Sequence, residues 1–234
     1  MNKKSIVYID GQYIKVTAQT LKVITPGQFQ AKGVFETMLA MGGKVFDVKE
    51  HLKRMRGAFK GVRVSPGIIE RVVKANGFAF SRVRVLAWQE GKHKHVAVMA
   101  LKHSFSKKKV FKVCFIQTNR LANSRWANTK SLDYKVFADA YQKARAKGFD
   151  EALLINSKGY VFEASRANIF IISQGRLLTP PLSSGCLNGI TRRKFIQMAR
   201  GWGMVVLEKN LTPAMIKSAT AAFLTNSLLG IKSF

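Results

Sequence analysis

The sequence predicts an α/β (α+β) fold built from two units. Short apolar runs joined by glycine-containing turns predict paired strands, and stretches with apolar residues at helical spacing lie between them. A polar stretch of about ten residues interrupts this pattern near the middle of the chain. We therefore expect a small N-terminal domain at residues 1–118, a linker at 119–129 and a C-terminal domain at 130–234.

The composition is that of a globular protein. The chain has 234 residues, of which 47% are hydrophobic, and this is enough for a sizeable core. No period of roughly 20 to 50 residues recurs, which excludes a repeat architecture.

The first half alternates strands with helices. A strand pair in residues 5–16 turns at Asp10-Gly11, which is the strongest short hairpin signal. Further strands are predicted within residues 33–48, 81–103 and 109–118.

Two helices are expected in this half. Asp47 and Glu50 resemble a capping box and predict a helix over residues 48–60. A second helix is predicted from near Pro66 to Gly77.

The second half opens with a predicted helix. Ser131 is its candidate N-cap and Gly148 ends it, so Lys130 lies directly before the helix. The elements expected after it are strand pairs at 151–164 and 168–180, a helix at 190–203, a strand at 204–210, a helix at 212–219 and a strand at 221–231.

Charge is the unusual feature of the composition. The chain has 40 Lys and Arg against 12 Asp and Glu, a net charge of +28. Such an excess favours nucleic acid, an anionic membrane or an acidic small molecule as partners. The basic residues are scattered and no nucleic-acid-binding signature accompanies them, so a solvated surface is the simpler interpretation.

Targeting and metal signals are weak. The apolar stretch before Asp10 is too short for a signal peptide and no apolar run reaches membrane-spanning length, which predicts a cytoplasmic protein with no membrane partner. Cys114 and Cys186 lie far apart without metal-ligand spacing. We expect two buried thiols, no disulfide framework and no metal site.

One pattern in the second half suits an anion. Gly189 precedes a predicted helix, so the N–H groups of Ile190 and Thr191 would point out of the positive end of its dipole. Asn226 and Ser227 follow an apolar strand and offer further donors. Many helices begin in this way and bind nothing, so both interpretations stay open.

Two charged residues raise a similar choice. Glu163 falls on the same strand face as Val161, where a carboxylate needs a partner, unless the strand is an exposed edge. Lys130 by itself is one surface lysine among many, although a lysine desolvated in a cleft becomes a nucleophile toward aldehydes.

Five strings occur in a fixed order: GVFETMLAMGGKVFDVKEHLKRM, KSLDY, GFDEALLINSKGYVFEASRANIFII, LLTPPLSSGCLNGITRR and AAFLTNSLLGI. This set resembles the class IV pyridoxal-phosphate family, which holds branched-chain aminotransferase, D-amino-acid aminotransferase and aminodeoxychorismate lyase. The resemblance covers nearly the whole chain beyond about residue 33. It implies a two-domain fold with a small N-terminal α/β domain and a pseudo-barrel-like C-terminal α/β domain that binds pyridoxal 5′-phosphate.

The resemblance also implies residue roles. Lys130 would form the Schiff base with the cofactor, and the Glu163 carboxylate would keep the pyridine nitrogen protonated, which makes the ring an electron sink. Leu187 would pack on the cofactor ring and Tyr134 would lie near its 3′-oxygen. The implied phosphate-binding residues are Arg54, Ile190, Thr191, Asn226 and Ser227.

Within the family, the string FLTNSLLGI and Thr37 in FETM resemble the lyase members. Our main hypothesis is therefore aminodeoxychorismate lyase, which forms 4-aminobenzoate and pyruvate in folate biosynthesis. Lys130 would be the general base and Thr37 would position or relay a proton. Arg84 and Arg120 are candidate anchors for the substrate's carboxylates.

Two alternatives remain. One is an aminotransferase acting on a branched-chain or D-amino acid, and the other is a nucleic-acid-binding homologue without the activity. The segment TPGQFQAKGVF and the ending GIKSF depart from the family pattern on the substrate side. The resemblance implies a homodimer and a small anionic amine as substrate, and the net charge adds non-specific nucleic-acid binding.

Overall fold

The computed structural model describes residues 5–17, 32–119 and 127–234. The chain forms two compact units: the first comprises residues 1–105 with 130–134, and the second comprises residues 106–129 with 135–234. This division differs at its borders from the domains expected from the sequence, whose limits stay a prediction.

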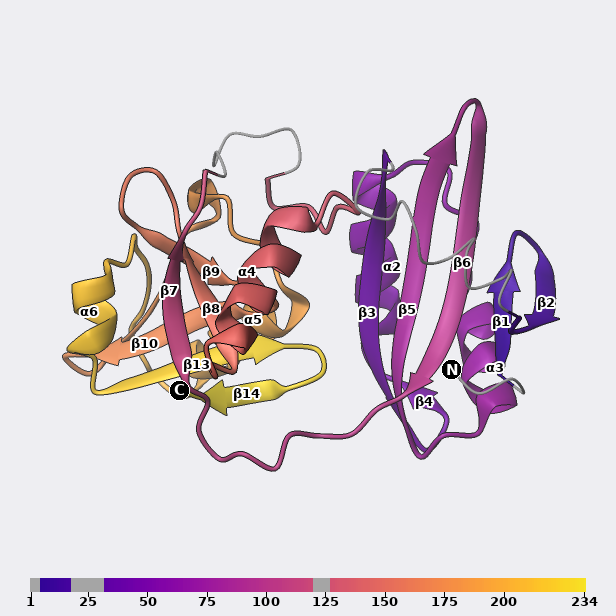
Figure 1. The fold of residues 1–234 in the computed structure, drawn as a ribbon. Coiled ribbons are helices and arrows are strands. Elements are labelled where there is room, and N and C mark those ends of the chain that lie inside the picture. The colour runs from indigo at the N-terminus through magenta and orange to yellow at the C-terminus, as the bar shows by residue number, and fades with distance from the viewer. Residues whose placement is uncertain (1–4, 18–31, 120–126) are drawn as a thin grey trace. The chain divides into compact units, whose positions relative to one another are not determined.

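The first unit contains a six-stranded antiparallel sheet in the order β2-β1-β6-β5-β3-β4 (Figure 1). Its strands are β1 (Ile6–Ile9), β2 (Gln12–Lys15), β3 (Lys32–Met41), β4 (Lys44–Val45), β5 (Phe80–Glu90) and β6 (His93–Lys102). Its helices are α2 (Val48–Ala58) and α3 (Pro66–Asn76).

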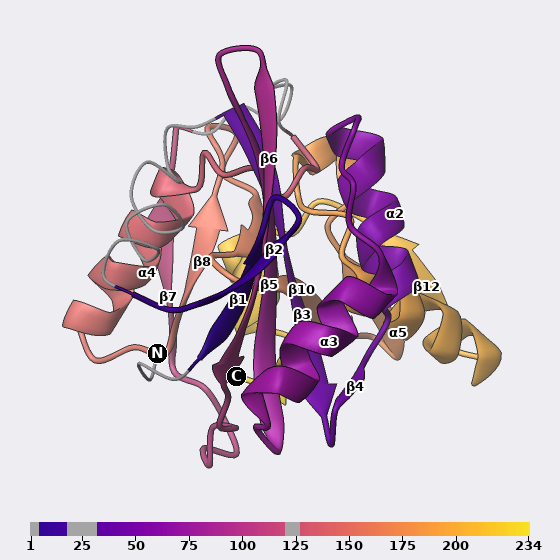
Figure 2. The ribbon, with the colours of Figure 1, turned by 90° about the vertical axis from the view of Figure 1, so that its right-hand side faces the viewer.

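The two faces of this sheet have different neighbours. Figure 2 shows α2 and α3 on the same side of the sheet, and α2 contacts β3 while α3 contacts β1 and β6. The other face carries its own apolar cluster, which includes Phe35, Leu86, Met99 and Leu132. Because both faces are apolar, the central strands read as nearly continuous hydrophobic runs.

Glycine turns close the strand pairs where the sequence predicted them. Asp10 and Gly11 have φ of 45° and 99°, and Gly42 and Gly43 have φ of 54° and 84°. Left-handed backbone at both central positions is the geometry of a type I′ turn. The predicted hairpins are therefore confirmed.

The helix after the second turn differs in its cap. Asp47 itself adopts a left-handed conformation and makes no side-chain cap hydrogen bond, so the expected capping box was wrong. The chain must turn sharply from β4 into α2, which leaves Asp47 without the extended conformation that a capping side chain needs. At α3 the expectation holds, since Ser65 caps the helix and Gly77 ends it.

The second unit contains two sheets. A five-stranded sheet has the order β12-β11-β10-β13-β14 and a three-stranded sheet has the order β7-β8-β9. The strands are β7 (Val113–Gln117), β8 (Glu151–Ile155), β9 (Val161–Ala164), β10 (Asn168–Ser173), β11 (Arg176–Thr179), β12 (Val206–Glu208), β13 (Ala221–Asn226) and β14 (Gly230–Ser233). The helices are α4 (Lys135–Ala146), η1 (Leu182–Ser184), α5 (Ile190–Gly201) and α6 (Pro213–Lys217).

Apolar side chains join these layers. One buried cluster combines residues of both sheets, among them Leu153, Ile169 and Leu224. Alternate residues of the five-stranded sheet, such as Phe170, point to its other face and pack on Phe195 of α5. The core of the second unit therefore lies on both sides of one sheet.

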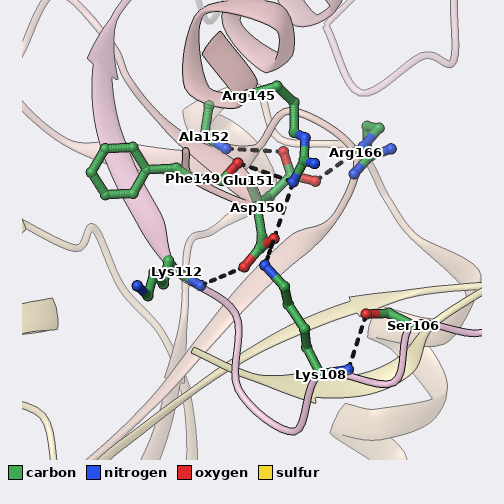
Figure 3. Close-up of polar contacts among 9 residues, drawn as sticks. All are labelled: Ser106, Lys108, Lys112, Arg145, Phe149, Asp150, Glu151, Ala152 and Arg166. Carbon is green, nitrogen blue, oxygen red and sulfur yellow. Dashed lines mark hydrogen bonds and ion pairs between the residues drawn. The ribbon is translucent and has the colours of Figure 1, made fainter. Parts of the chain in front are cut away.

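Buried carboxylates fasten the segment that enters this unit (Figure 3). Asp150 accepts hydrogen bonds from Lys108 Nζ at 2.5 Å, from the Lys112 N–H at 3.0 Å and from Arg145 Nη1 at 3.1 Å. Next to it Glu151 is fully buried and is paired with Arg166 at 3.1 Å. These contacts tie residues 106–112 to the start of β8.

The structure bears on two sequence predictions, one about buried thiols and one about membrane-spanning segments. Cys186 is buried, and burial is the main cause that raises its pKa to about 12, so it is an inert thiol. Within the described ranges, no helix has the length and apolar character needed to cross a lipid bilayer.

Candidate active site

Lys130 lies on a short segment, residues 130–134, that joins the edge of β3 in the first unit. The Phe35 N–H donates to the Lys130 carbonyl at 2.9 Å, and the Leu132 N–H donates to the Gly33 carbonyl at 2.9 Å. Leu132 is also buried in the same cluster as Phe35. Two backbone hydrogen bonds and one buried side chain hold Lys130 against this strand.

The expected helix cap at this point was wrong. Helix α4 begins at Lys135, whereas Ser131 forms a bridge with Val34 and its Oγ accepts from the Asp133 N–H at 3.0 Å. The backbone around Ser131 is hydrogen-bonded to β3 and is therefore not available for a helix. The stop at Gly148, with φ of 79°, is confirmed.

Gly33 permits this close approach. A Cβ at position 33 would lie 2.7 Å from Leu132 Cδ1 and 2.8 Å from Trp88 Cα, and it would collide with the Ala87 carbonyl oxygen. Two of these atoms belong to the backbone of β5 and have no room to move. The position therefore requires glycine.

Three of the predicted site residues contact the Phe35 ring. Lys130 Nζ lies 4.5 Å from its centroid and Arg84 Cζ lies 5.1 Å from it. The Tyr134 ring meets Phe35 edge-on, with centroids 5.3 Å apart, and Lys130 Nζ is 5.9 Å from the Tyr134 centroid. A ring face attracts cations, so Phe35 gives both basic groups a common neighbour.

Thr37 and Arg84 face each other across two strands. They are direct partners in the register of β3 and β5, and strand alternation places Thr37 on the same face as Phe35. The pKa of Arg84 is lowered mainly by burial and further by Arg82, although a guanidinium stays charged in proteins. The predicted anchor is thus a partly buried cation beside an apolar ring.

Arg54 is held on the other face of the sheet. Its Nε donates to Glu36 Oε1 at 2.7 Å and its Nη2 donates to Glu36 Oε2 at 2.6 Å. His51 Nδ1 lies 2.7 Å from Glu36 Oε2. Burial alone would raise the pKa of Glu36, but the hydrogen bonds of His51 and Arg54 outweigh it and hold this pKa at about 2.

Glu163 is buried in the second unit, so of the two interpretations left open by the sequence the exposed edge is wrong. Its side chain is 5% exposed in β9, and Oε2 accepts a hydrogen bond from the Leu187 N–H at 3.1 Å. The structure therefore brings together Glu163 and Leu187, two residues that the family pattern assigned to one cofactor ring.

The start of α5 is closely packed. Gly189 is its N-cap, and a Cβ at that position would collide with Asn168 Oδ1 and lie 3.3 Å from Arg192 Cβ. Asn168 Nδ2 in turn donates to the Leu187 carbonyl at 2.8 Å. The first N–H groups of the helix, at Ile190 and its neighbours, lack intrahelical acceptors and are typical anion donors.

Thr225 adds a donor that the sequence analysis missed. It is the cross-strand partner of Asn168 and is 1% exposed. Its Oγ1 has no hydrogen-bond partner within the part of the chain that the structure describes. A buried hydroxyl left unpaired costs about 1–3 kcal/mol, which is expected where a ligand completes the bonding.

The last predicted site residues are Asn226, Ser227 and Arg120. Asn226 Nδ2 donates to the Arg166 carbonyl at 3.0 Å, and Asn226 Oδ1 accepts from the N–H groups of Leu228 and Leu229 at 2.8 Å each, so this side chain shapes the turn between β13 and β14. Ser227 lies in the same turn. Arg120 falls outside the described residues.

The model of the class IV aminotransferase family matches residues 33–233. This chain belongs to that family. A probable branched-chain-amino-acid aminotransferase of Rickettsia typhi is 27% identical over 97% of this chain and 85% of its own length.

Two solved structures are also similar. The branched-chain aminotransferase of the archaeon Thermoproteus uzoniensis, solved with norvaline, has a TM-score of 0.87 and 28% identity over 98% of this chain and 86% of that chain. A Legionella pneumophila protein described as a candidate 4-amino-4-deoxychorismate lyase has a TM-score of 0.79 and 26% identity over 88% of this chain and 83% of that chain. The α/β fold predicted from the sequence is confirmed, and so is a pyridoxal-phosphate-dependent enzyme.

The described residues fit this cofactor. Asn168 packs so closely on Gly189 that no side chain fits at the start of α5, and the unpaired Thr225 hydroxyl opposite Asn168 is suited to a phosphate oxygen. A buried carboxylate at Glu163, already fixed by one backbone N–H, is suited to a protonated ring nitrogen.

Sequence reasoning also missed three residues of the first unit, which lie in the contacts around Lys130 and Arg54. Phe35 and Glu36 read as parts of an apolar strand, and His51 reads as a helix residue beside Leu52. The period of the strand assigns Glu36 to the α2 face, which is a signal that could have been used. The partner of that carboxylate follows only from how α2 packs on β3.

Proposed function

We propose that this protein is a pyridoxal-phosphate-dependent aminotransferase whose amino donor is a branched-chain or similar apolar amino acid. The observation that carries the proposal is the match of a probable branched-chain aminotransferase over 97% of the chain. The surroundings of Lys130 support it, since one partly buried arginine and two aromatic rings suit a substrate with one carboxylate and an apolar side chain.

Bound pyridoxal phosphate supplies an aldehyde for covalent attachment and an electron sink for the charge that develops at the substrate's α-carbon. In the proposal Lys130 Nζ holds the cofactor and moves the proton at that carbon. Glu163 keeps the proton on the ring nitrogen, oriented by the Leu187 N–H, and the Leu187 side chain packs on the ring.

Phosphate binding is assigned to three kinds of donor. They are the N–H groups of Ile190 and Thr191, the Thr225 hydroxyl and, by the family resemblance, the Arg54 guanidinium. Asn226 and Ser227 contribute through the turn that they form. Each donor is a backbone N–H, a hydroxyl or a cation, which are the groups that phosphate oxygens accept from.

Substrate binding is assigned to the face of β3 that carries Lys130. Arg84 binds the α-carboxylate, because a guanidinium matches a carboxylate with two parallel hydrogen bonds. Phe35 and Tyr134 receive the apolar side chain of the amino acid. Arg120 is retained as a second carboxylate anchor, a proposal that rests on the sequence resemblance.

A half-reaction tests the proposal. Purified protein loaded with pyridoxal phosphate is mixed with leucine, valine or D-alanine, and its absorption spectrum is followed. We expect leucine or valine to convert the cofactor to its amine form, while Lys130→Arg gives no conversion and no borohydride-trapped adduct at position 130. Failure of every amino acid in the wild-type protein would contradict the proposal.

A lyase remains the second candidate. It is favoured by Thr37 opposite Arg84, by the string TNSLLG and by the similarity to the Legionella protein. With aminodeoxychorismate as substrate, release of 4-aminobenzoate and pyruvate without conversion of the cofactor would favour the lyase. Thr37→Val would then reduce that release more than it reduces amino-group transfer.

Two partner proposals accompany this function. We expect a homodimer, as the sequence resemblance implies, and sedimentation at several concentrations checks it. We also expect non-specific binding of nucleic acid, which follows from the net charge of +28 and must weaken steeply as salt rises.

A further inference from the structure

A buried ion cluster lies between β3 and α2 in the first unit. Glu36 is 1% exposed, His51 is 1% exposed and the Arg54 side chain is 15% exposed. His51 and Arg54 stand three residues apart on α2, so both project from one face of the helix toward Glu36. The carboxylate thus receives three contacts of 2.6–2.7 Å.

Fold stability alone does not favour such a cluster over apolar residues. Removing ionised groups from water costs several kcal/mol for each ion, and apolar residues of similar volume usually stabilise a core as well or better. The surrounding residues on this face, such as Val34, Met38 and Leu52, are apolar and fully buried. A cluster retained among them points to a requirement for orientation.

The geometry fixes the Arg54 guanidinium in one plane. Glu36 binds its Nε and Nη2, which form one edge of the planar group. A guanidinium has five N–H donors in a rigid plane, so two bonds on one edge set the direction of all the others. His51 holds Oε2 from a second direction and prevents the carboxylate from rotating.

The cluster is also next to the Lys130 backbone. Glu36 directly follows Phe35, whose N–H donates to the Lys130 carbonyl. Consecutive Cα atoms lie about 3.8 Å apart, so one strand position separates the residue that holds Lys130 from the residue that holds Arg54. A single strand therefore positions both groups.

We propose that Glu36 is a positioning residue that orients the Arg54 guanidinium toward the phosphate of the cofactor, with His51 fixing the Glu36 carboxylate. The proposal rests on the function proposed above and adds residues that the family resemblance did not assign. It makes Arg54 a directional hydrogen-bond donor whose own charge is largely balanced by Glu36.

The sign of one substitution separates orientation from charge. If Arg54 acted only as a positive charge, removing the negative charge of Glu36 would strengthen phosphate binding. If Arg54 must be oriented, Glu36→Gln weakens phosphate binding, because the glutamine amide presents an N–H₂ group to one of the arginine donors.

The experiment compares two ligands that differ in the phosphate alone. Dissociation constants of pyridoxal 5′-phosphate and pyridoxal are measured by absorption for the wild type, Glu36→Gln, Arg54→Lys and the double variant. We expect Glu36→Gln to weaken pyridoxal phosphate about tenfold and to leave pyridoxal within about twofold. The double variant should lose little more than Arg54→Lys alone, since both changes remove one interaction.

Glu50→Gln is the matched control, because Glu50 is an exposed acid on the same helix. It should change neither dissociation constant. If Glu36→Gln fails to fold, Glu36→Asp is measured instead. It keeps the charge but moves the carboxylate away from Arg54 by one methylene, so it should still lower the preference for the phosphorylated ligand.

The binding results distinguish failure of the positioning role from failure of the proposed function. Tighter or unchanged binding of pyridoxal phosphate by the Glu36 variants, or an equal loss for both ligands, overturns the positioning role while the proposed function stands. Failure of the wild-type protein to form a trapped adduct with either ligand overturns the proposed function and this inference with it.

Discussion

The backbone N–H of Phe35 donates to the carbonyl of Lys130 at 2.9 Å. These residues are far apart in the sequence, and Lys130 belongs by its contacts to the first unit although the helix that follows belongs to the second. The lysine is therefore positioned by β3, and its Nζ lies over the ring of the residue that holds its backbone.

Gly33→Ala should destabilise the protein through this attachment. Its Cβ would meet the backbone of β5 and the Leu132 side chain, and overpacking against fixed atoms costs about 1–3 kcal/mol or more. Urea denaturation measures the loss. Gly57→Ala is the control, because a Cβ there meets nothing within 4 Å in α2, and it should stabilise by about 0.5–1 kcal/mol. Equal effects at the two positions would contradict the close packing at Gly33.

Glu36 should make stability depend on pH in the acid range. Its pKa falls from 4.5 to about 2 in the folded protein, so the ionised form stabilises the fold above about pH 4.5, and this contribution is lost as the pH falls toward 2. The shift corresponds to a free energy on the order of 3 kcal/mol. Unfolding of the wild type and Glu36→Gln should differ most at pH 7 and least near pH 2. A difference that does not shrink on acidification would show that the carboxylate's charge is not responsible.

Asp150→Asn should loosen residues 106–112. Asp150 is 6% exposed and binds Lys108, Arg145 and the Lys112 N–H, but both basic side chains are about half exposed, so we expect a loss of about 1–2 kcal/mol. Hydrogen exchange at the Lys112 amide should accelerate. Asp139→Asn removes an exposed pair with Lys135 and should change stability by less than about 0.5 kcal/mol. Unchanged exchange at Lys112 would argue against the role of Asp150.

Thr225→Val should separate binding from folding. The hydroxyl is buried and unpaired among the described residues, so replacing it by a methyl group should leave the fold equally stable or stabilise it by about 1 kcal/mol. The affinity for pyridoxal phosphate should fall, and that for pyridoxal should stay the same. Destabilisation of the ligand-free protein would mean that the hydroxyl has a structural partner instead.

The lyase hypothesis shows that sequence motifs identify the family more readily than they distinguish its lyase members from its aminotransferase members. Thr37 and TNSLLG favoured the lyase, whereas a relative named as a probable aminotransferase matches along almost the whole chain. The roles proposed for Lys130, Glu163 and the start of α5 belong to the cofactor chemistry that all members share. In our proposal the substrate is selected by side chains such as Arg84 and Phe35, whose neighbours depend on the register of β3 and β5.

Local pattern alone determined the hairpins and most helix ends. Strand alternation and left-handed glycine positions are properties of neighbouring residues, and the order of the family strings identified Lys130. Tertiary structure alone decided that residues 130–134 pair with β3, that Phe35 gathers Lys130, Tyr134 and Arg84, and that Glu36 holds Arg54. These contacts join residues far apart in the chain, and their energies depend on sheet register and helix packing, which no local period of the sequence encodes.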